Sequence, residues 1–508
     1  MRSTARKNRE GHTVRRNFRH HYEALPVCVA MLALAGCGGS TSPTPSASAC
    51  AACSVGGAVT GLSGNESVTL LDNGADALEV VADGSFTFST DQSTGTTYDV
   101  TVKSHTPGIA CAVSNGSGAV GKSNVTGVMV SCGVGTESVL YSFVGGTTDG
   151  VRPEAGLIMD DAGDLYGTTI GGGANGDGTV FKISAAGTES VVHSFGGGTT
   201  DGAGPYAGLI MDGAGNLYGM TMYGGANSGG TVFKISATGT ESVLYSFPAG
   251  SFSIPAVSTT VGSTWIAGQY GGLVMDSSRN LYGTTNAGGT SNNGMIFKIS
   301  AAGAESVVYS FEGGTTDGSD PEAGPILDSA GNLYGTTFGA GATGAGTVFK
   351  VSSGGTETIL HSFAGGTTDG LGARAGVVMD SAGNLYGTTF AGGMKGDGTV
   401  FELSPTGTET ILHSFTGGTS DGSGPLAGLI IDSAGNLFGT TAYGGTNGDG
   451  TVFKVNPTGT ETVLYSFAGG PTDGANPVGD LVMDSAGDLY GTTVYGGANG
   501  GGTVFKIN

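Results

Sequence analysis

Short stretches in which apolar and polar residues alternate recur along the chain from Glu137 onward. Alternation with a period of two places every second side chain on the same face, as in a half-buried β-strand. Each recurrence holds four such stretches separated by glycine-rich turn sequences. Around residue 400 the stretches are 375–380, 384–389, 398–403 and 409–415. The pattern therefore predicts four short antiparallel strands in each unit.

The unit repeats at a nearly constant spacing. A Tyr-Ser-Phe or His-Ser-Phe motif occurs seven times, at intervals of 52 residues apart from one of 64, beginning at Tyr141, His193, Tyr245, Tyr309, His361, His413 and Tyr465. Four short strands at a period near 50 are typical of a β-propeller blade. The array begins with the fourth kind of strand and ends with the third, so the first strand can complete the last blade. The sequence predicts a seven-bladed β-propeller of four-stranded blades at 133–508, with a right-handed β-solenoid as the alternative.

A different alternating pattern precedes the repeats, at residues 54–132. Its strand-like runs include 67–71, 85–88 and 98–102, and Asp-Asn-Gly at 72–74 fits a tight hairpin turn. This predicts a small β-sandwich, so the whole chain is expected to be all-β. The segment resembles the immunoglobulin-like or prealbumin-like modules of bacterial surface lipoproteins, which implies a spacer.

The N-terminus has the features of an export signal. Seven basic residues lie within residues 1–26, and a short apolar run from Leu25 to Gly36 follows them. Leu34-Ala35-Gly36-Cys37 resembles a bacterial lipobox, which implies a signal peptide at 1–36 and lipid on Cys37. Gly38 follows, which favours the outer membrane or cell surface, and 37–53 reads as a flexible Ser/Pro/Ala linker. Arg15-Arg16-Asn17-Phe18 weakly resembles a twin-arginine signal, so the export route stays open.

Four cysteines remain after the leader and the lipidation site. Cys50, Cys53, Cys111 and Cys132 are an even number in an exported chain, which indicates disulfides. Three pairings are possible, and we prefer Cys111 with Cys132 and Cys50 with Cys53. A redox or zinc role for the Cys-x-x-Cys pair is the alternative.

Composition narrows the class of protein. The chain has 101 glycines among 508 residues but no Gly-X-Y period, so a collagen is excluded, and the glycines indicate many turns. The formal net charge is −22, and a surface this acidic repels nucleic acid.

The repeats resemble the Gloeobacter–Verrucomicrobia (GloVer) tandem repeat. The features that carry the likeness are Gly383-Asn384-Leu385-Tyr386-Gly387-Thr388-Thr389 and the later Gly398-Thr399-Val400-Phe401. The likeness covers about 137–508 in seven copies in register. It implies an exported propeller and brings no known reaction.

Residues present in all seven copies are more simply explained by building the blade than by chemistry. Seven aspartates open a hairpin of the form D-x-x-x-[ND]: Asp160, Asp212, Asp276, Asp328, Asp380, Asp432 and Asp484. We interpret them as acceptors for backbone N–H groups, with Ca²⁺ binding as the alternative. Seven glutamates are likewise interpreted as structural in the other hairpin: Glu137, Glu189, Glu241, Glu305, Glu357, Glu409 and Glu461. His193, His361 and His413 replace tyrosine in the motif and are interpreted as packing residues.

The loops after the fourth strands and those between the second and third strands are expected to share one face. This face is the predicted ligand-binding surface. The first loop set contributes six loop-face aspartates: Asp149, Asp201, Asp317, Asp369, Asp421 and Asp473. Aromatic residues in the second set include Tyr223, Tyr443 and Tyr495. Carboxylates beside flat rings suit a carbohydrate or a cation, while Asp-Gly as a simple tight turn is the alternative for any one aspartate.

One loop departs from the pattern. After Phe247 an insertion carries Phe252 and Trp265, which is the only tryptophan in the chain. A longer loop on the binding face is a common source of specificity. These two rings could stack on a ligand or plug the central channel.

The sequence favours a non-enzymatic, monomeric binding module of the bacterial envelope. The membrane is reached through the lipid anchor, the expected ligand is a glycan or a protein, and no cofactor is predicted. A carbohydrate-active hydrolase or lyase that uses two carboxylates is the first alternative. A structural envelope protein is the second.

Overall fold

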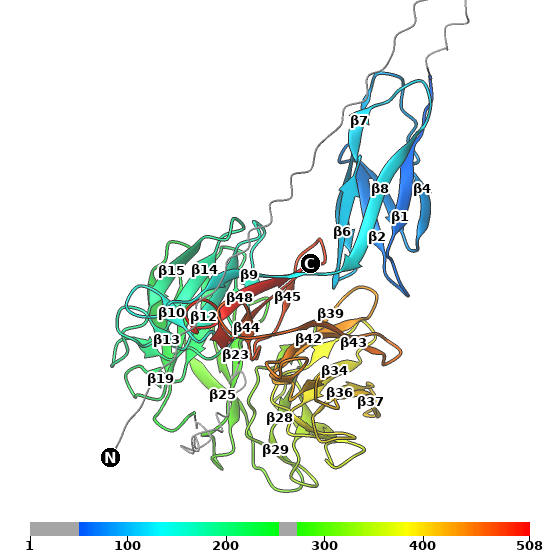
Figure 1. Ribbon diagram of the computed structural model, residues 1–508. Helices are drawn as coiled ribbons and strands as arrows, with labels where there is room; N and C mark the ends of the chain where they lie inside the picture. The colour runs from blue at the N-terminus through cyan, green and yellow to red at the C-terminus, as the bar shows by residue number, and fades with distance from the viewer. Residues whose placement is uncertain (1–49, 253–271) are drawn as a thin grey trace, which may run out of the picture. The chain divides into compact units, whose positions relative to one another are not determined.

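The computed structural model describes residues 50–252 and 272–508, and in these ranges the protein is all-β (Figure 1). Among the described residues there is no helix long and apolar enough to cross a membrane. The predicted leader, Cys37 and Trp265 lie outside the described residues.

The first eight strands form two four-stranded sheets, in the orders β4-β1-β8-β6 and β3-β2-β5-β7. Alternate side chains of both sheets enter one apolar core, in which Val59, Leu70 and Val130 are fully buried. The strands are β1 (Val55–Thr60), β2 (Val68–Asp72), β3 (Asp76–Val80), β4 (Gly84–Thr87), β5 (Thr97–His105), β6 (Ile109–Ser114), β7 (Ser117–Ala119) and β8 (Val125–Val134).

Two disulfides brace this N-terminal part. Cys111 and Cys132 face each other on the paired strands β6 and β8, with Cα atoms 4.1 Å apart. Cys50 and Cys53 close a short loop before β1. The predicted disulfides are confirmed, in the preferred pairing.

Seven four-stranded antiparallel sheets follow along the described chain, each with neighbouring strands paired in order. Their first strands are β11 (Ile158–Met159), β17 (Ile210–Met211), β22 (Val274–Met275), β27 (Ile326–Leu327), β33 (Val378–Met379), β39 (Ile430–Ile431) and β45 (Val482–Met483). The second strands are β12 (Leu165–Thr169), β18 (Leu217–Thr221), β23 (Leu281–Thr285), β28 (Leu333–Thr337), β34 (Leu385–Thr389), β40 (Leu437–Thr441) and β46 (Leu489–Thr493). The third strands are β14 (Thr179–Ile183), β20 (Thr231–Ile235), β24 (Met295–Ile299), β30 (Thr347–Val351), β36 (Thr399–Leu403), β42 (Thr451–Val455) and β48 (Thr503–Ile507). The fourth strands are β15 (Glu189–Ser194), β21 (Glu241–Ser246), β25 (Glu305–Ser310), β31 (Glu357–Ser362), β37 (Glu409–Ser414), β43 (Glu461–Ser466) and β9 (Glu137–Ser142).

The last sheet takes its fourth strand from the beginning of the array. β9 pairs with β48 from Ser142 opposite Thr503 to Glu137 opposite Ile507 (Figure 1). β48 is therefore paired on both sides, by β46 and by β9, and β9 takes the outer place that the fourth strand has in the other six sheets.

Two-stranded ladders join the two kinds of loop within six of the repeats. For example, Gly150 in the loop after β9 pairs with Gly172 in the loop after β12. Both loops therefore lie at the same end of the sheet, as expected for a shared face. The ladders are β10 (Gly150–Val151) with β13 (Gly171–Gly172), β16 (Gly202–Ala203) with β19 (Tyr223–Gly224), β26 (Gly318–Ser319) with β29 (Gly339–Ala340), β32 (Gly370–Leu371) with β35 (Ala391–Gly392), β38 (Gly422–Ser423) with β41 (Tyr443–Gly444) and β44 (Gly474–Ala475) with β47 (Tyr495–Gly496).

Phenylalanine pairs fill the space between consecutive sheets. The phenylalanine that follows each fourth strand packs edge-on against the third-strand phenylalanine of the next sheet, and both rings are buried. The seven pairs have ring centroids 5.0–5.2 Å apart: Phe143–Phe181, Phe195–Phe233, Phe247–Phe297, Phe311–Phe349, Phe363–Phe401, Phe415–Phe453 and Phe467–Phe505. Phe143 belongs to the last sheet and Phe181 to the first, so these two sheets are also in contact.

Features that recur in every copy of the repeat have structural reasons. A Cβ atom on Gly387 would lie 2.6 Å from the ring of Phe401, so only glycine lets the second strand pass this ring. Asp380 accepts N–H bonds from Ala382 and Asn384, each at 2.9 Å, and the Tyr386 hydroxyl donates to its second oxygen. The interpretation of this aspartate as a turn acceptor is confirmed.

Candidate functional site

The loop-face aspartates turn inward. In Asp421, Oδ1 accepts the N–H of Gly422 at 2.6 Å and Oδ2 accepts the N–H of Thr416 at 2.8 Å. Five of the six are at most 8% exposed: Asp149, Asp317, Asp369, Asp421 and Asp473. These carboxylates therefore hold their own loops in shape, and their burial puts them out of reach of a ligand the size of a sugar.

Each of these aspartates also contacts the first residue of the Tyr/His-Ser-Phe motif. The hydroxyl of Tyr141 donates to Asp149 at 3.0 Å, that of Tyr309 to Asp317 at 2.9 Å, and that of Tyr465 to Asp473 at 3.0 Å. In the other three repeats a histidine Nε2 faces the aspartate instead, at 3.4–3.6 Å. The same position thus offers a hydroxyl donor in some repeats and an imidazole in others.

A glutamate from the following sheet completes each group. Glu189, at the start of β15, lies close enough to Asp149 to be affected by its charge, and burial together with this charge raises the pKa of Glu189 to about 7. Glu409 experiences the same two effects, with Asp369 as the neighbour. We call each set of motif Tyr or His, loop aspartate and next-sheet glutamate an acidic junction. Six occur among the described residues: Tyr141/Asp149/Glu189, His193/Asp201/Glu241, Tyr309/Asp317/Glu357, His361/Asp369/Glu409, His413/Asp421/Glu461 and Tyr465/Asp473/Glu137.

These glutamates lie in the other hairpin, as interpreted: Glu189 is the first residue of β15 and pairs with Ile183 at the end of β14. The Oε1 atom is buried and has no hydrogen-bond partner in Glu137, Glu189, Glu241, Glu357, Glu409 and Glu461. In addition to this hairpin pairing, the carboxyl group of Glu189 lies near Asp149 of the neighbouring repeat. The glutamate therefore recurs along the chain at a position where one repeat contacts the next.

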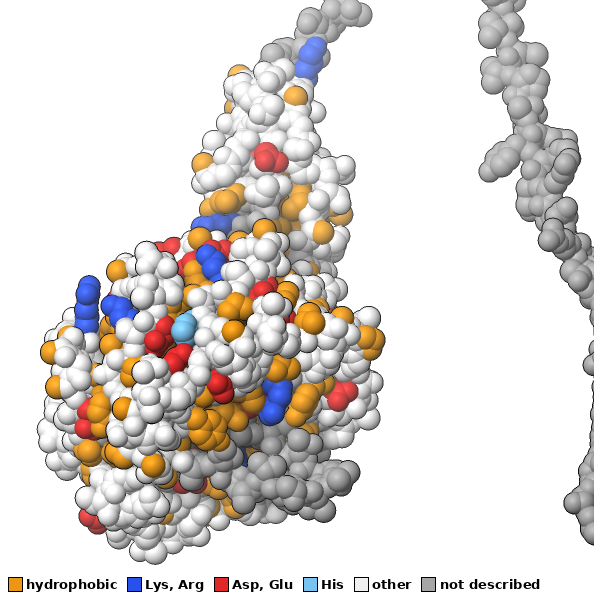
Figure 2. Space-filling model, turned by 90° about the vertical axis from the view of Figure 1, so that its left-hand side faces the viewer, with side chains coloured by type: hydrophobic (Ala, Val, Ile, Leu, Met, Phe, Trp, Pro, Cys, Tyr) orange, Lys and Arg blue, Asp and Glu red, His pale blue; other side chains and the backbone are white. Residues whose placement is uncertain are grey.

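His193, His361 and His413 are packing residues, as interpreted, but only one side of each imidazole ring packs against a neighbour. Each stacks edge-on against the phenylalanine two residues later, with centroids 4.8–5.0 Å apart. The Nε2 edge points to the carboxylates and is buried without a hydrogen-bond partner. Figure 2 shows one face of the molecule, on which a histidine lies among acidic side chains and reaches the surface.

Aromatic side chains gather on the loop face. Phe390 and Tyr443 both border Gly424, and Tyr443 and Tyr495 pack on the same apolar cluster as Phe390. Tyr223 is 44% exposed and borders Gly204 together with Tyr206. We call this set the aromatic band: Tyr206, Tyr223, Phe338, Phe390, Tyr443 and Tyr495. It contains all three of the tyrosines predicted for the binding face.

Two arginines are inserted into the aromatic band. Arg374 lies over Phe338 at 4.3 Å and over Phe390 at 5.3 Å, and it pairs with the buried Glu322 at 2.8 Å. Burial raises the pKa of Glu322 to about 7, against the effect of Arg374. These contacts fix the guanidinium between two rings and a carboxyl group.

Arg152 makes a second such group on the same face. It pairs with the buried Glu154 at 2.5 Å and lies close to Tyr206 and Tyr495, while its own side chain is 43% exposed. The group therefore presents a cation and aromatic rings to solvent over a buried carboxyl.

The sequence interpretation missed both arginine–glutamate pairs. Arg152, Glu154, Glu322 and Arg374 occupy two equivalent positions in the repeat, which are Gly204 and Tyr206 in the second copy. Comparing the copies with one another at these two positions would have found them, because their charge and size change from copy to copy. The sequence signal for these pairs was a change of residue type between repeats at the same two positions.

A small cavity of about 150 Å³ is lined by equivalent glycines of neighbouring sheets, among them Gly324, Gly376 and Gly428. The last repeat has Asp480 where the other copies have glycine, and its carboxylate accepts the N–H of Gly428 at 2.6 Å. Burial raises the pKa of Asp480. This single substitution makes one side of the cavity acidic.

The insertion residue Phe252 is part of the core. Its ring packs edge-on against the buried Phe247, with centroids 5.4 Å apart. Ser251 beside it is also buried, and its hydroxyl donates to the Pro248 carbonyl at 2.8 Å. Phe252 therefore stabilises the start of the insertion.

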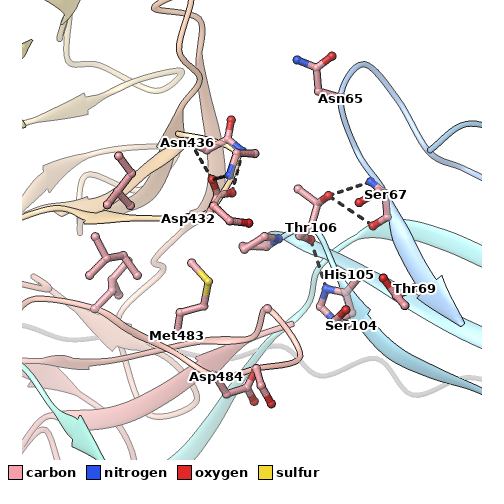
Figure 3. A pocket seen from close by; sticks show the side chains of 18 of the residues that line it. Asn65, Ser67, Thr69, Ser104, His105, Thr106, Asp432, Asn436, Met483 and Asp484 are labelled. Atoms are coloured by element: carbon pink, nitrogen blue, oxygen red, sulfur yellow. Dashed lines mark hydrogen bonds between the residues drawn. The ribbon is translucent and has the colours of Figure 1, made fainter. Parts of the chain in front are cut away.

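A larger cavity of about 720 Å³ is lined by the side chains shown in Figure 3. Its polar groups largely bond to one another: Thr106 accepts the N–H of Ser67 at 2.8 Å, and Asn436 donates to Asp432 at 2.7 Å. These pairs leave few groups aimed into the cavity, and we assign it no function.

The fold and the site together define a repeat protein built of β-propeller-like sheets, with polar and aromatic side chains on its loop face. The chain belongs to the Gloeobacter/Verrucomicrobia repeat family, whose model matches residues 108–269, 262–430 and 321–508. The predicted family is thereby confirmed. None of the curated proteins matches the chain.

Solved structures that resemble the chain are distant. A putative 6-phosphogluconolactonase from Bacteroides uniformis is 14% identical, with 82% of this chain and 98% of that chain covered and a TM-score of 0.39. A putative gluconolactonase is 11% identical, and the match covers 74% of this chain and 92% of that chain with a TM-score of 0.34. Porphyromonas gingivalis dipeptidyl peptidase 4 is 10% identical, and the match covers 66% of this chain and 46% of that chain with a TM-score of 0.33. Likenesses this remote carry no information about activity.

Proposed function

We propose that the protein is a lipid-anchored, non-enzymatic β-propeller of the bacterial envelope that binds a glycan on its loop face. In this proposal the seven sheets are the blades of one closed ring, and residues 54–132 form a β-sandwich spacer. The phenylalanine pairs support a ring, because they link every sheet to the next and the last sheet to the first.

Export and anchoring rest on the sequence. Leu34-Ala35-Gly36-Cys37 supplies the lipidation site, and residues 38–53 the tether. The two disulfides support an oxidising compartment outside the cytoplasm.

The observation that carries the binding role is the group formed by Arg152, Glu154, Tyr206, Tyr223 and Tyr495. Sugar rings present apolar C–H faces that stack on aromatic rings, and their hydroxyls bond to charged side chains. The group offers both kinds of contact, on a face where the loops are held rigid by buried aspartates. Rigid loops lower the entropy lost on binding.

A glycan array with the purified protein tests the proposal. We expect Tyr223→Ala and Arg152→Ala each to weaken binding by about tenfold, which corresponds to about 1.4 kcal/mol. Val307→Ala is the matched control, because Val307 is also an exposed apolar residue (52%) but lies on the fourth strand β25. Trp265→Ala is measured in the same series, because the insertion is the second predicted contact.

Three outcomes would contradict the proposal. If no glycan binds the wild type, the loop face does not recognise sugars, and a protein ligand or a structural role takes its place. If Tyr223→Ala binds as the wild type does, the aromatic band is not the site. Release of a cleaved sugar would make the protein an enzyme.

A further inference from the structure

We infer that three of the acidic junctions are binding sites for a divalent transition-metal ion, with zinc as the best fit. The three are those in which the motif residue is histidine: His193/Asp201/Glu241, His361/Asp369/Glu409 and His413/Asp421/Glu461. This property is independent of glycan binding and lies on different residues.

The ligand atoms are already close together. In each set one nitrogen and two carboxylate oxygens lie within 4.8 Å of one another. The Nε2–Oδ2 distance is 3.4 Å for His193 with Asp201, 3.6 Å for His361 with Asp369, and 3.4 Å for His413 with Asp421. Ligands about 2.0–2.2 Å from a zinc ion are separated by about 3–3.6 Å, so small side-chain rotations complete the geometry.

The second observation is that the inward-facing atoms make no hydrogen bond, although each histidine Nε2 lies at ion-pair distance from the aspartate. Nε2 of all three histidines is buried with no hydrogen bond, and so is Oε1 of Glu241, Glu409 and Glu461. Buried polar atoms are nearly always hydrogen-bonded, so buried atoms that converge on one point without a hydrogen bond call for an explanation. A bound cation satisfies all of them at once.

The chemistry of the donors matches zinc. A neutral imidazole and two carboxylates balance the charge of a divalent ion, whereas the same carboxylates side by side without a cation repel each other. The histidine side chains are 18–20% exposed, which leaves a path for the ion and room for a water as fourth ligand. Mixed nitrogen and oxygen donors also suit cobalt, which makes Co²⁺ a spectroscopic substitute.

The tyrosine junctions provide an internal comparison. Where the motif residue is tyrosine, its hydroxyl donates to the aspartate, and the phenol offers no neutral nitrogen to a metal. The carboxylates are the same in both kinds of junction. The exchange of one side chain therefore distinguishes a hydrogen-bonded junction from a metal-binding one.

The ion would join neighbouring sheets. His361 and Asp369 belong to one repeat, while Glu409 begins β37 of the next. β37 also carries His413, so one strand contributes to two consecutive sites.

Zinc binding by the purified full-length protein tests the inference, measured by isothermal titration calorimetry with zinc alone. We expect the wild type to bind three more equivalents per chain than the triple variant His193→Tyr, His361→Tyr, His413→Tyr. Tyrosine already occupies this position in four repeats, so the variant keeps a side chain that the fold accepts. Each single His→Tyr variant is expected to lose one equivalent, which gives an answer even if the triple variant does not fold.

The reverse substitution is the sharper test. Tyr465→His places an imidazole beside Asp473 and Glu137 and is expected to add a fourth equivalent. Tyr245→His is the control, because the residue eight positions later in the sequence is a serine, and it is expected to add none. Visible absorption of the Co²⁺-loaded protein reports whether nitrogen is among the ligands.

Two results would overturn the inference. One is equal zinc stoichiometry in the wild type and the triple variant, or in the wild type and each single variant. The other is an unchanged Co²⁺ spectrum after all three histidines are replaced.

Discussion

In six of the seven repeats, the glutamate at the start of the fourth strand has a partly buried carboxyl group beside an aspartate of the neighbouring repeat. The pKa is raised to about 7 in Glu137, Glu189, Glu241, Glu357, Glu409 and Glu461, with burial as the larger cause and the aspartate as the second. In the unfolded chain the same groups titrate near the ordinary glutamate value of about 4.3. Their protonated forms are therefore favoured by folding.

This difference makes stability depend on pH. A group whose pKa is higher in the folded state stabilises fully below about pH 4.3, and the contribution is lost as the pH rises through about 7. We expect the melting temperature in metal-free buffer to fall by several degrees between pH 5 and pH 8, as measured by circular dichroism. Glu357→Gln, at a tyrosine junction, is expected to reduce the slope, because glutamine cannot ionise. A melting temperature that rises over this range would show that the carboxyls are not buried in this way.

At the scale of the element, the hairpin between the first and second strands depends on one aspartate. Asp380 accepts two backbone N–H bonds and the hydroxyl of Tyr386, so its removal leaves several donors unpaired. We expect Asp380→Ala to lower the free energy of unfolding by about 2–3 kcal/mol, measured by urea denaturation. Ser381→Ala, next to it on the exposed turn, is the control and is expected to change stability by less than about 0.5 kcal/mol. Equal effects of the two substitutions would mean that the turn does not depend on the carboxylate.

The strands themselves were predictable from alternation. In the fifth repeat the expected runs 384–389, 398–403 and 409–415 correspond to β34, β36 and β37. The first strand is shorter than its apolar run, with only Val378 and Met379 paired. A run of apolar residues indicates which side chains are buried, but it does not indicate where the backbone pairing of the strand ends.

The site was less predictable, for a physical reason. An Asp-Gly turn has the same sequence whether the carboxylate points to solvent or, as in Asp421, back to the N–H groups of its own loop. The contact between Asp149 and Glu189 joins residues 40 positions apart and exists only once two sheets pack together. No local pattern encodes it.

At the scale of the whole molecule, closure has a measurable consequence. Phe505 packs against Phe467 between the sixth and last sheets, just as Phe401 packs against Phe363 between the fourth and fifth. If the array is a closed ring, the last sheet is an interior member like any other. We expect Phe505→Ala and Phe401→Ala each to cost about 3–5 kcal/mol in guanidinium denaturation. A much smaller cost for Phe505→Ala would indicate an open, fraying end.

The pairing of β9 with β48 also decides how the molecule meets mechanical force. Any pull that travels along the backbone from residues 50–134 enters the array at Glu137, on the strand that holds the two ends of the array together. Tension is therefore applied directly to the hydrogen bonds between β9 and β48, which pass it on to the rest of the array. We therefore expect this strand pair to be the first to open when the array is pulled from its N-terminal side.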